Sequence, residues 1–168
     1  IHAHNDSELG VAVSLEAVRA GAAQVQGTIN GFGERTGNAN LCSILPNLML
    51  KMGYTALKPG ALKRLREVSQ FVFEMANIRP WERLPYVGDS AFAHKAGMHV
   101  DGVRKNTRSF EHIDPAEVGN QRRILVSELS GASNVFLKAV ELGLNLDRSS
   151  PEVREVLREL ERMERAGY

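Results

Sequence analysis

Residues 1–10, IHAHNDSELG, join the end of a short strand to the start of a helix, and we expect this junction to set the fold. Apolar side chains recur at helical spacing over residues 7–20, and Gly21 follows, so this stretch predicts an amphipathic helix. Three residues could cap its start: Asn5, Asp6 and Ser7. Residues 24–30 then alternate apolar and polar side chains and predict a strand. A strand end, a helix and a second strand follow the βαβ rhythm of a parallel α/β fold.

The composition is that of an ordinary globular protein and excludes several classes of function. The 168 residues include 43% hydrophobic residues, enough for a core, and 21 Lys and Arg balance 20 Asp and Glu. The net charge of +1 gives no basic field for nucleic acid or for a membrane surface. No apolar run approaches the roughly 20 residues of a membrane span. The lone Cys42 cannot form an internal disulfide, so we expect a cytoplasmic protein.

The rest of the chain reads as helices with short connections. A helix is predicted over 41–52, capped by Asn40 and kinked at Pro46, and further helices over 62–77 and 91–105. A helical turn from Pro115 and a strand over 123–127 follow. The last two predicted elements are a helix from Ser130 or Ser133 to Leu142 and an amphipathic helix that begins at Pro151. Between the second and third of these helices, Pro80 and Pro85 predict an irregular connection.

The pair His2 and His4 is the first candidate for chemistry. Residues two apart on a strand point to the same face, so the two imidazoles would project together and could share a divalent cation. The alternative is a polar strand end that faces solvent. A position at the carboxyl end of a strand favours the metal site, because ligands collect at that rim in α/β barrels. Imidazole nitrogens with oxygen ligands suit Zn, Mn, Co or Fe(II) better than Ca.

The second candidate is the loop Gly31–Asn38, which holds three glycines and leaves the predicted strand at the same rim. Glycines let the backbone approach a ligand closely, Asn38 offers a neutral oxygen, and Glu34 and Arg35 offer a charge pair. The alternative is a tight turn with a surface Glu34–Arg35 ion pair.

These segments together resemble the 2-isopropylmalate, homocitrate and citramalate synthase family. The resemblance is carried by HAHND at 2–6, LGVAVSLEAVRAG at 9–21 and QGTINGFGERTGN at 26–38. Further segments, NANLCSILPNL at 38–48, HKAGMHVDGV at 94–103 and EHIDPAEVGN at 111–120, are most similar to the citramalate synthase branch.

The resemblance implies an acyltransferase that condenses acetyl-CoA with an α-keto acid in a metal-dependent Claisen-type reaction, followed by thioester hydrolysis. For the citramalate branch the acceptor is pyruvate; isopropylmalate or homocitrate synthesis is the alternative. The family's metal ligands map onto His2, His4 and Asn38 and would hold Zn, Mn or Mg, and Glu34 and Asn5 are expected to bind substrate. The family also implies a homodimer that serves isoleucine or leucine biosynthesis.

A histidine and a tyrosine from the region after the barrel act in the neighbouring subunit's site in this family. The histidine corresponds to His99, which we expect to be catalytic. The tyrosine corresponds to Phe110, whose phenyl ring cannot donate a hydrogen bond. His112 could replace the hydroxyl, although a turn-stabilising role is the alternative. His94 is expected to be structural.

The resemblance implies a fold in two parts: residues 1–58 as the last strand-helix units of a TIM (β/α)8 barrel, and residues 59–168 as a small helical subdomain. An eight-stranded barrel needs about 250 residues. The chain is therefore expected to begin at the seventh strand, and the remaining metal ligand, the acceptor-binding Arg and the base would lie upstream. Taken by itself, this piece could alternatively be a non-catalytic helical interaction or dimerisation module.

Overall fold

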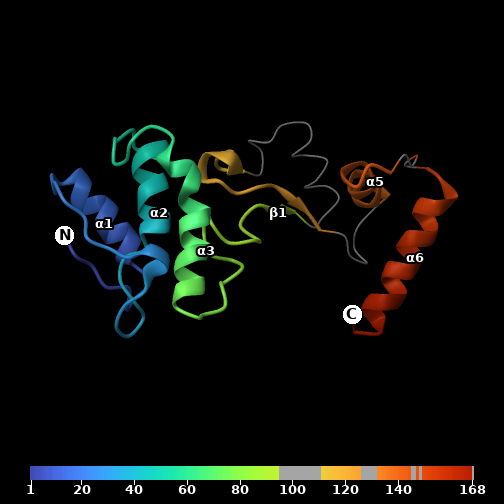
Figure 1. The fold of residues 1–168 in the computed structure, drawn as a ribbon, viewed down its shortest axis with the longest axis horizontal. Coiled ribbons are helices and arrows are strands. Elements are labelled where there is room, and N and C mark those ends of the chain that lie inside the picture. The colour runs from blue at the N-terminus through green and yellow to red at the C-terminus, as the bar shows by residue number, and fades with distance from the viewer. Residues whose placement is uncertain (95–110, 126–131, 145–146, 148, 168) are drawn as a thin grey trace. The chain divides into compact units, whose positions relative to one another are not determined.

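The computed structural model describes residues 1–94, 111–125, 132–144, 147 and 149–167 (Figure 1). The chain forms two compact units, one made of residues 1–91 and 115–121 and the other of residues 92–114 and 122–168. Each unit is described here by itself. Within the described residues, no helix has both the length and the apolar character needed to cross a membrane.

The first helix, α1 (Gly10–Arg19), confirms the predicted amphipathic segment and begins three residues later than predicted. Of the three possible capping residues, Asn5 takes part: its Oδ1 accepts the Gly10 N–H at 3.1 Å, although the N-cap position itself is Leu9. The buried Ser14 hydroxyl donates to the Gly10 carbonyl at 2.7 Å. The start of α1 is therefore attached directly to the His-x-His segment.

The predicted strand over 24–30 is wrong as a continuous strand. The backbone makes isolated bridges instead, His2 with Gln26 and Thr28 with Asn40 in parallel, and His4 with Asn38 in antiparallel orientation. The 3-10 turn η1 (Ile29–Gly31) follows at once. Short strand pairs are only marginally stable without further strands beside them. The structure is thus mainly helical, and barrel strands are not seen among its described residues.

The second helical segment confirms both its predicted cap and its predicted irregularity. Asn40 Oδ1 accepts the Cys42 N–H at 2.9 Å and starts α2 (Leu41–Pro46). The helix then changes to the π-helical η2 (Asn47–Lys51), directly after Pro46. Proline has no N–H to continue the α-helical pattern, which explains the change at this point.

The apolar faces of these helices form the core of the first unit. Ala39, Ile44 and Leu48 are its buried centre, and partly buried side chains of α1, including Val11, Leu15 and Val18, pack against it. The 3-10 turn η3 (Ala61–Arg64) leads into α3 (Leu65–Met75), which contacts α2 (Figure 1). Residues 76–91 have no helix or strand, as the two prolines predict. The helical turn η5 (Pro115–Val118) is confirmed and belongs to this unit.

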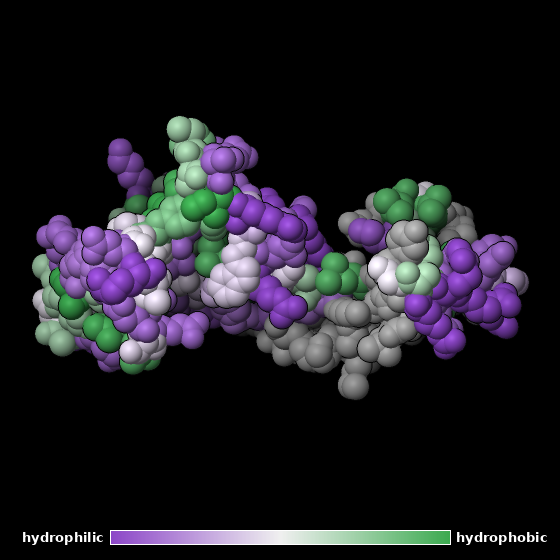
Figure 2. Space-filling model, turned by 90° about the horizontal axis from the view of Figure 1, so that it is seen from below, coloured by the Kyte–Doolittle hydropathy of each residue, from purple (hydrophilic) through white to green (hydrophobic). Residues whose placement is uncertain are grey.

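The second unit pairs two very short parallel strands, β1 (Ala93–His94) and β2 (Arg123–Ile124). The strand predicted over 123–127 is confirmed at its start. The helix predicted over 91–105 is wrong where it is described, because residues 93–94 are extended; residues 95–105 lie outside the described residues. The helices α5 (Ala132–Glu141) and α6 (Pro151–Arg165) confirm the last two predictions. The exposed residues of α6 are mostly Glu and Arg, and the side of Figure 2 where α6 lies in Figure 1 shows mainly hydrophilic surface.

A buried ion cluster lies beside the extended residues 93–94, which pair with Arg123 and Ile124. The Glu111 side chain, only 2% exposed, accepts two hydrogen bonds from Arg122 at 2.6 and 2.5 Å and contacts His94 Nε2 at 3.0 Å. His94 is therefore structural, as predicted. Burial raises the pKa of Glu111, but the hydrogen bonds from Arg122 and His94 outweigh burial and hold that pKa below its usual value. The tertiary contact thus overrides the local helical preference.

Replacing Glu111 with Gln should destabilise the protein by about 2–4 kcal/mol at neutral pH, because Arg122 would lose its anionic partner. Glu67→Gln is the matched control: Glu67 also pairs with an arginine, Arg64, but is 65% exposed, and should cost at most about 1 kcal/mol. Thermal unfolding of both variants measures the difference.

The pH dependence of this effect has a definite sign. The folded-state pKa of Glu111 lies below its unfolded value, so its stabilisation is present above the unfolded pKa and is lost as pH falls through the folded pKa. The difference in unfolding free energy between the wild-type protein and Glu111→Gln should therefore disappear at acid pH. Equal effects of Glu111→Gln and Glu67→Gln at neutral pH would contradict the role assigned to the buried cluster.

Candidate functional site

The two histidines of the first segment lie side by side. His2 Nε2 and His4 Nε2 are 3.4 Å apart, and the rings meet edge to face with centroids 5.1 Å apart. Two nitrogens that each lie about 2.0–2.1 Å from one zinc ion are about 3.0–3.4 Å apart, depending on the coordination angle. The pair therefore has the spacing of two ligands of a single cation, as the alternation along an extended segment predicts.

The glycine-rich loop holds Asn38 next to this segment. The backbone bridge between His4 and Asn38 joins the two, and the Asn5 N–H donates to the Gly37 carbonyl at 2.9 Å. The Asn38 amide nitrogen donates to the Phe32 carbonyl at 2.9 Å, which fixes the orientation of the side chain. A Cβ on Gly33 would lie 2.3 Å from that nitrogen, so a side chain at this position would displace the Asn38 amide.

Two buried polar atoms in this region have no hydrogen-bond partner among the described residues, His4 Nδ1 and Asn38 Oδ1. A buried acceptor without a partner costs free energy, which a cation at Asn38 Oδ1 would recover. Histidines that bind metal through Nε2 normally donate the other ring N–H to an acceptor, and the described residues offer none to His4 Nδ1. The residues present fit a divalent cation through two nitrogens and one amide oxygen.

Among the described residues, no cluster of three or more His, Cys, Asp and Glu side chains could hold a metal ion. This finding does not bear on the combination of His2, His4 and Asn38, because an asparagine amide is not among those side chains. Two histidines and an amide leave coordination positions for further ligands. Such a set offers neutral ligands that leave the charge of the cation largely available to a bound anionic substrate.

An ion pair ties the loop to the segment that follows the histidines. Arg35 donates to both carboxylate oxygens of Asp6, at 2.7 and 3.1 Å, and these bonds hold the pKa of Asp6 below its usual value. The predicted partner of Arg35, Glu34, lies 3.7 Å away and is 86% exposed. The carboxylate of Glu34 is therefore open to solvent. The other residue predicted to bind substrate, Asn5, already uses its Oδ1 to accept the Gly10 N–H at the start of α1.

The remaining predicted residues are not brought into this arrangement by the described structure. His99 and Phe110 lie outside the described residues. His112 belongs to the second unit, where its ring stacks on Phe92 with centroids 6.1 Å apart. Cys42, which the sequence did not place in a site, is buried, and burial raises the pKa of its thiol.

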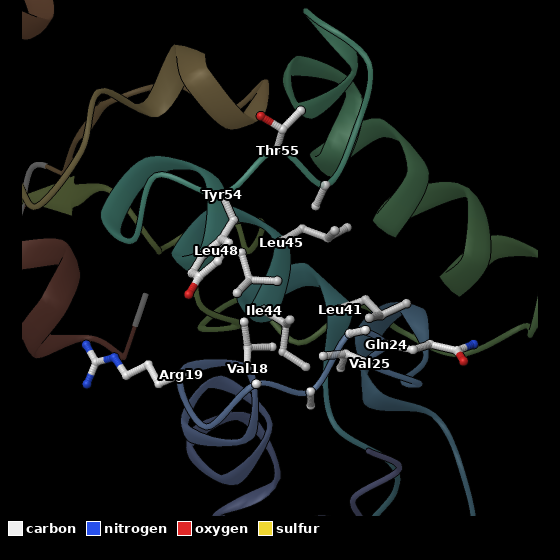
Figure 3. Close-up of a pocket in the computed structure, with 14 residues that line it drawn as sticks. Val18, Arg19, Gln24, Val25, Leu41, Ile44, Leu45, Leu48, Tyr54 and Thr55 are labelled. Atoms are coloured by element: carbon white, nitrogen blue, oxygen red, sulfur yellow. The ribbon is translucent and has the colours of Figure 1, made fainter.

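The cavities among the described residues of the first unit include two of substantial size. The larger, about 810 Å³, lies between α1, the segment after it and α2, and is lined mainly by aliphatic side chains such as Val18, Ile44 and Leu48 (Figure 3). Its lining has Arg19 as its only charged residue and contains no carboxylate or imidazole, so we regard it as a packing surface. The second, about 510 Å³, has five asparagines in its lining, Asn5 and Asn38 among them.

Sequence reasoning missed this second cavity and the asparagines that line it. Asn30, which has a left-handed backbone (φ 60°), donates to the Ser69 carbonyl at 2.9 Å and accepts from the Ser69 hydroxyl at 2.5 Å. Asn40 and Asn47 line the same cavity from α2 and its continuation. The available signal was the unusual density of asparagines between residues 30 and 47.

Comparison with known proteins is consistent with this arrangement. Residues 1–72 match the family described as HMGL-like, and residues 86–167 match the homocitrate synthase post-HMGL domain-like family. The chain belongs to the HMGL-like and homocitrate synthase family. The resemblance predicted from the His-x-His and glycine-loop segments is confirmed.

The relatives of this family member include enzymes of two named activities. Over its whole length it is 54% identical to (R)-citramalate synthase of Aquifex aeolicus and 52% identical to that of Geobacter sulfurreducens, matching 32% of each. It is 41% identical, over 99% of its length, to 2-isopropylmalate synthase of Sulfolobus acidocaldarius, matching 42% of that protein. The chain thus spans about a third of the length of these citramalate synthases.

Proposed function

We propose that this chain is part of an acyltransferase that condenses acetyl-CoA with pyruvate to form citramalate, with hydrolysis of the thioester. The identity of 50–54% over the whole chain to four (R)-citramalate synthases is the observation that carries the proposal. The spacing of the two histidines and the unpartnered Asn38 oxygen support it independently. We further propose that residues 1–58 belong to the barrel and residues 59–168 to the helical subdomain, and that the enzyme is cytoplasmic.

In this proposal His2, His4 and Asn38 hold a divalent cation, which when bound polarises the keto group of the acceptor and stabilises negative charge on its oxygen. The chain's own residues then fix the geometry of the site. The Asp6–Arg35 pair and the Asn5–Gly37 backbone bond hold the loop against the histidine segment. A fixed acceptor beside the thioester converts a bimolecular step into one between positioned groups.

The assignments outside this centre are also proposals. Glu34, whose side chain is 86% exposed, and Asn5, which lines the asparagine-containing cavity, are proposed to bind substrate. His99 is proposed to transfer protons in the site of a partner subunit, so the active form would be a homodimer. Phe110 cannot supply the hydroxyl of the family's tyrosine, so proton transfer would rest on His99.

The test is an assay of the complete protein that contains this chain. We expect release of CoA from acetyl-CoA with pyruvate, and release at least about tenfold slower with 2-oxoisovalerate or 2-oxoglutarate, since one pocket contact discriminates by about that factor. The measurement is thiol release together with chromatographic identification of citramalate.

Metal dependence is the control within the same assay. A chelator should abolish activity, and Zn, Mn or Mg should restore it, because the amide and imidazole ligands do not themselves polarise the acceptor. Preferred turnover of 2-oxoisovalerate would instead favour 2-isopropylmalate synthesis, which the 41% identity to such an enzyme makes the second candidate. Turnover unaffected by complete metal removal would rule out the proposed centre.

A further inference from the structure

Asn30 is the only one of the chain's ten asparagines that a glycine follows. An asparagine before a glycine cyclises readily, because glycine has no side chain to hinder attack by its own nitrogen on the asparagine amide. The pair lies in the turn η1, where Asn30 has φ 60° and ψ 7° and Gly31 has φ 74°. A chemically reactive pair therefore lies in the loop that leads to Asn38.

Contacts with α3 hold the Asn30 side chain. Its Nδ2 donates to the Ser69 carbonyl at 2.9 Å, and its Oδ1 accepts from the Ser69 hydroxyl at 2.5 Å. The Cys42 thiol lies 3.5 Å from the same oxygen. Ser69 is completely buried and is 39 residues away in the chain, so both of its bonds to Asn30 depend on the tertiary fold. Ser69 therefore fixes the position of the amide.

The nitrogen that would attack this amide is also held. The Gly31 N–H donates to the Thr28 carbonyl at 3.2 Å and closes the turn. Attack requires the Gly31 nitrogen to lose this bond and the Asn30 amide to leave Ser69 and turn toward that nitrogen. The fold thus suppresses a reaction that the sequence favours.

We propose that Asn30–Gly31 is a self-modification site, which forms a succinimide and then isoaspartate when the amide is released from Ser69. In the first step the Gly31 nitrogen bonds to Asn30 Cγ, the Cγ–Nδ2 bond breaks, and Nδ2 leaves as ammonia with the proton of the Gly31 N–H. Water then opens the ring. Cleavage between the nitrogen and Cγ gives aspartate, and cleavage between the nitrogen and the Asn30 carbonyl carbon gives isoaspartate.

The modification reaches the proposed metal centre, a consequence that rests on the proposed function. The Gly31 carbonyl accepts the Asn38 N–H at 3.0 Å. Isoaspartate lengthens the backbone by a methylene group directly before Gly31. Aspartate places a carboxylate oxygen where Nδ2 now donates to the Ser69 carbonyl, so two acceptors face each other there. Either product disturbs the turn that positions Asn38.

The test measures isoaspartate at residue 30 in the complete protein, kept at neutral pH below its unfolding temperature, by peptide mapping with mass spectrometry. Ser69→Ala removes the hydroxyl donor and should form isoaspartate about tenfold faster than the wild-type protein, because loss of one hydrogen bond changes an equilibrium by up to about that factor. Ser14→Ala is the matched control. Ser14 is also a completely buried helical serine, but its hydroxyl bonds within its own helix, so the rate at residue 30 should stay within about twofold.

The wild-type protein supplies a second comparison that needs no variant. Unfolded in urea, it should form isoaspartate at residue 30 about a hundredfold faster than when folded, because both bonds to Ser69 and the bond from Gly31 to Thr28 are then lost. Asn77 is the internal reference. It is exposed and also has a left-handed backbone, but Ile78 follows it, so it should form little isoaspartate in either state.

Equal rates in the folded and unfolded wild-type protein would overturn the inference, as would an unchanged rate in Ser69→Ala. A slower rate in Ser69→Ala would also overturn it, since the hydroxyl would then activate the amide. If Ser69→Ala does not fold, Ser69→Cys, whose thiol is a weaker donor, decides in its place.

Activity is measured on the same samples and should fall in proportion to the isoaspartate at residue 30. Isoaspartate formation with full activity would overturn the link to Asn38. Failure of the proposed function is a separate result, in which the freshly prepared wild-type protein releases no CoA with any α-keto acid. The isoaspartate measurement does not depend on that activity.

Discussion

Replacing His4 with alanine is expected to lower citramalate formation by the complete protein at least about a thousandfold, and His2→Ala should act similarly. The two Nε2 atoms are 3.4 Å apart and form one end of the proposed centre, so removal of either leaves the cation with a single imidazole. The polarisation of the acceptor depends on that cation. Activity and metal content, measured on the same purified samples, should fall together.

The control for this prediction is Glu16→Gln, which changes an exposed ion pair on α1 and should leave activity and metal content unchanged. A His4→Ala protein that retained both full metal content and full activity would refute the site. A protein that lost activity but kept its metal would instead indicate that His4 binds substrate.

Replacing Gly37 with alanine is expected to reduce activity about a hundredfold or more, because a displacement of about 1 Å in a catalytic group has an effect of this size. Gly37 has φ +98°, and a Cβ there would lie 1.9 Å from the Gly31 carbonyl oxygen. The loop can remove this clash only by moving, and Asn38 is the next residue. Metal content and kcat, measured together, report the displacement of the Asn38 amide.

Gly53→Ala separates the clash from simple backbone strain. Gly53 also has a left-handed backbone, with φ +76°, but a Cβ there would meet no atom within 4 Å. Both substitutions therefore share the cost of an alanine at positive φ, about 1–2 kcal/mol. Only Gly37→Ala should lose metal content and activity. Equal losses of activity in the two variants would show that backbone strain, and not the crowded loop, is responsible.

Features that depend on near neighbours were predicted well from the sequence. The cap that Asn40 provides to α2 reaches only two residues along the chain, and the change of helix type follows directly from Pro46. In the amphipathic helices α1 and α6, apolar residues recur from one helical turn to the next, so the sequence shows their spacing directly. The paired histidines of an extended segment belong to the same class, because alternation alone brings positions 2 and 4 to one face.

Features that depend on distant partners were predicted poorly. The strand expected over 24–30 is reduced to bridges with residues 2 and 40, because a ladder depends on strands that lie beside it in space. The helix expected from residue 91 begins as a strand, since His94 contacts Glu111 seventeen residues away. Arg35 keeps the predicted contact with its neighbour Glu34 at 3.7 Å, but its shorter pair is with Asp6, a carboxylate that the fold brings from 29 residues away.

The sequence by itself indicated the family and most of the helices, and the family resemblance in turn gave the three proposed metal ligands. The family and these helices follow from contiguous segments, whose residue types and spacing carry the information. Only the tertiary structure decided which asparagines share one cavity, which carboxylate holds Arg35, and that Gly33 and Gly37 leave room for the Asn38 loop. The physical reason is that hydrogen bonds and steric contacts act over a few ångströms in space, and the fold brings together residues that are far apart in the chain.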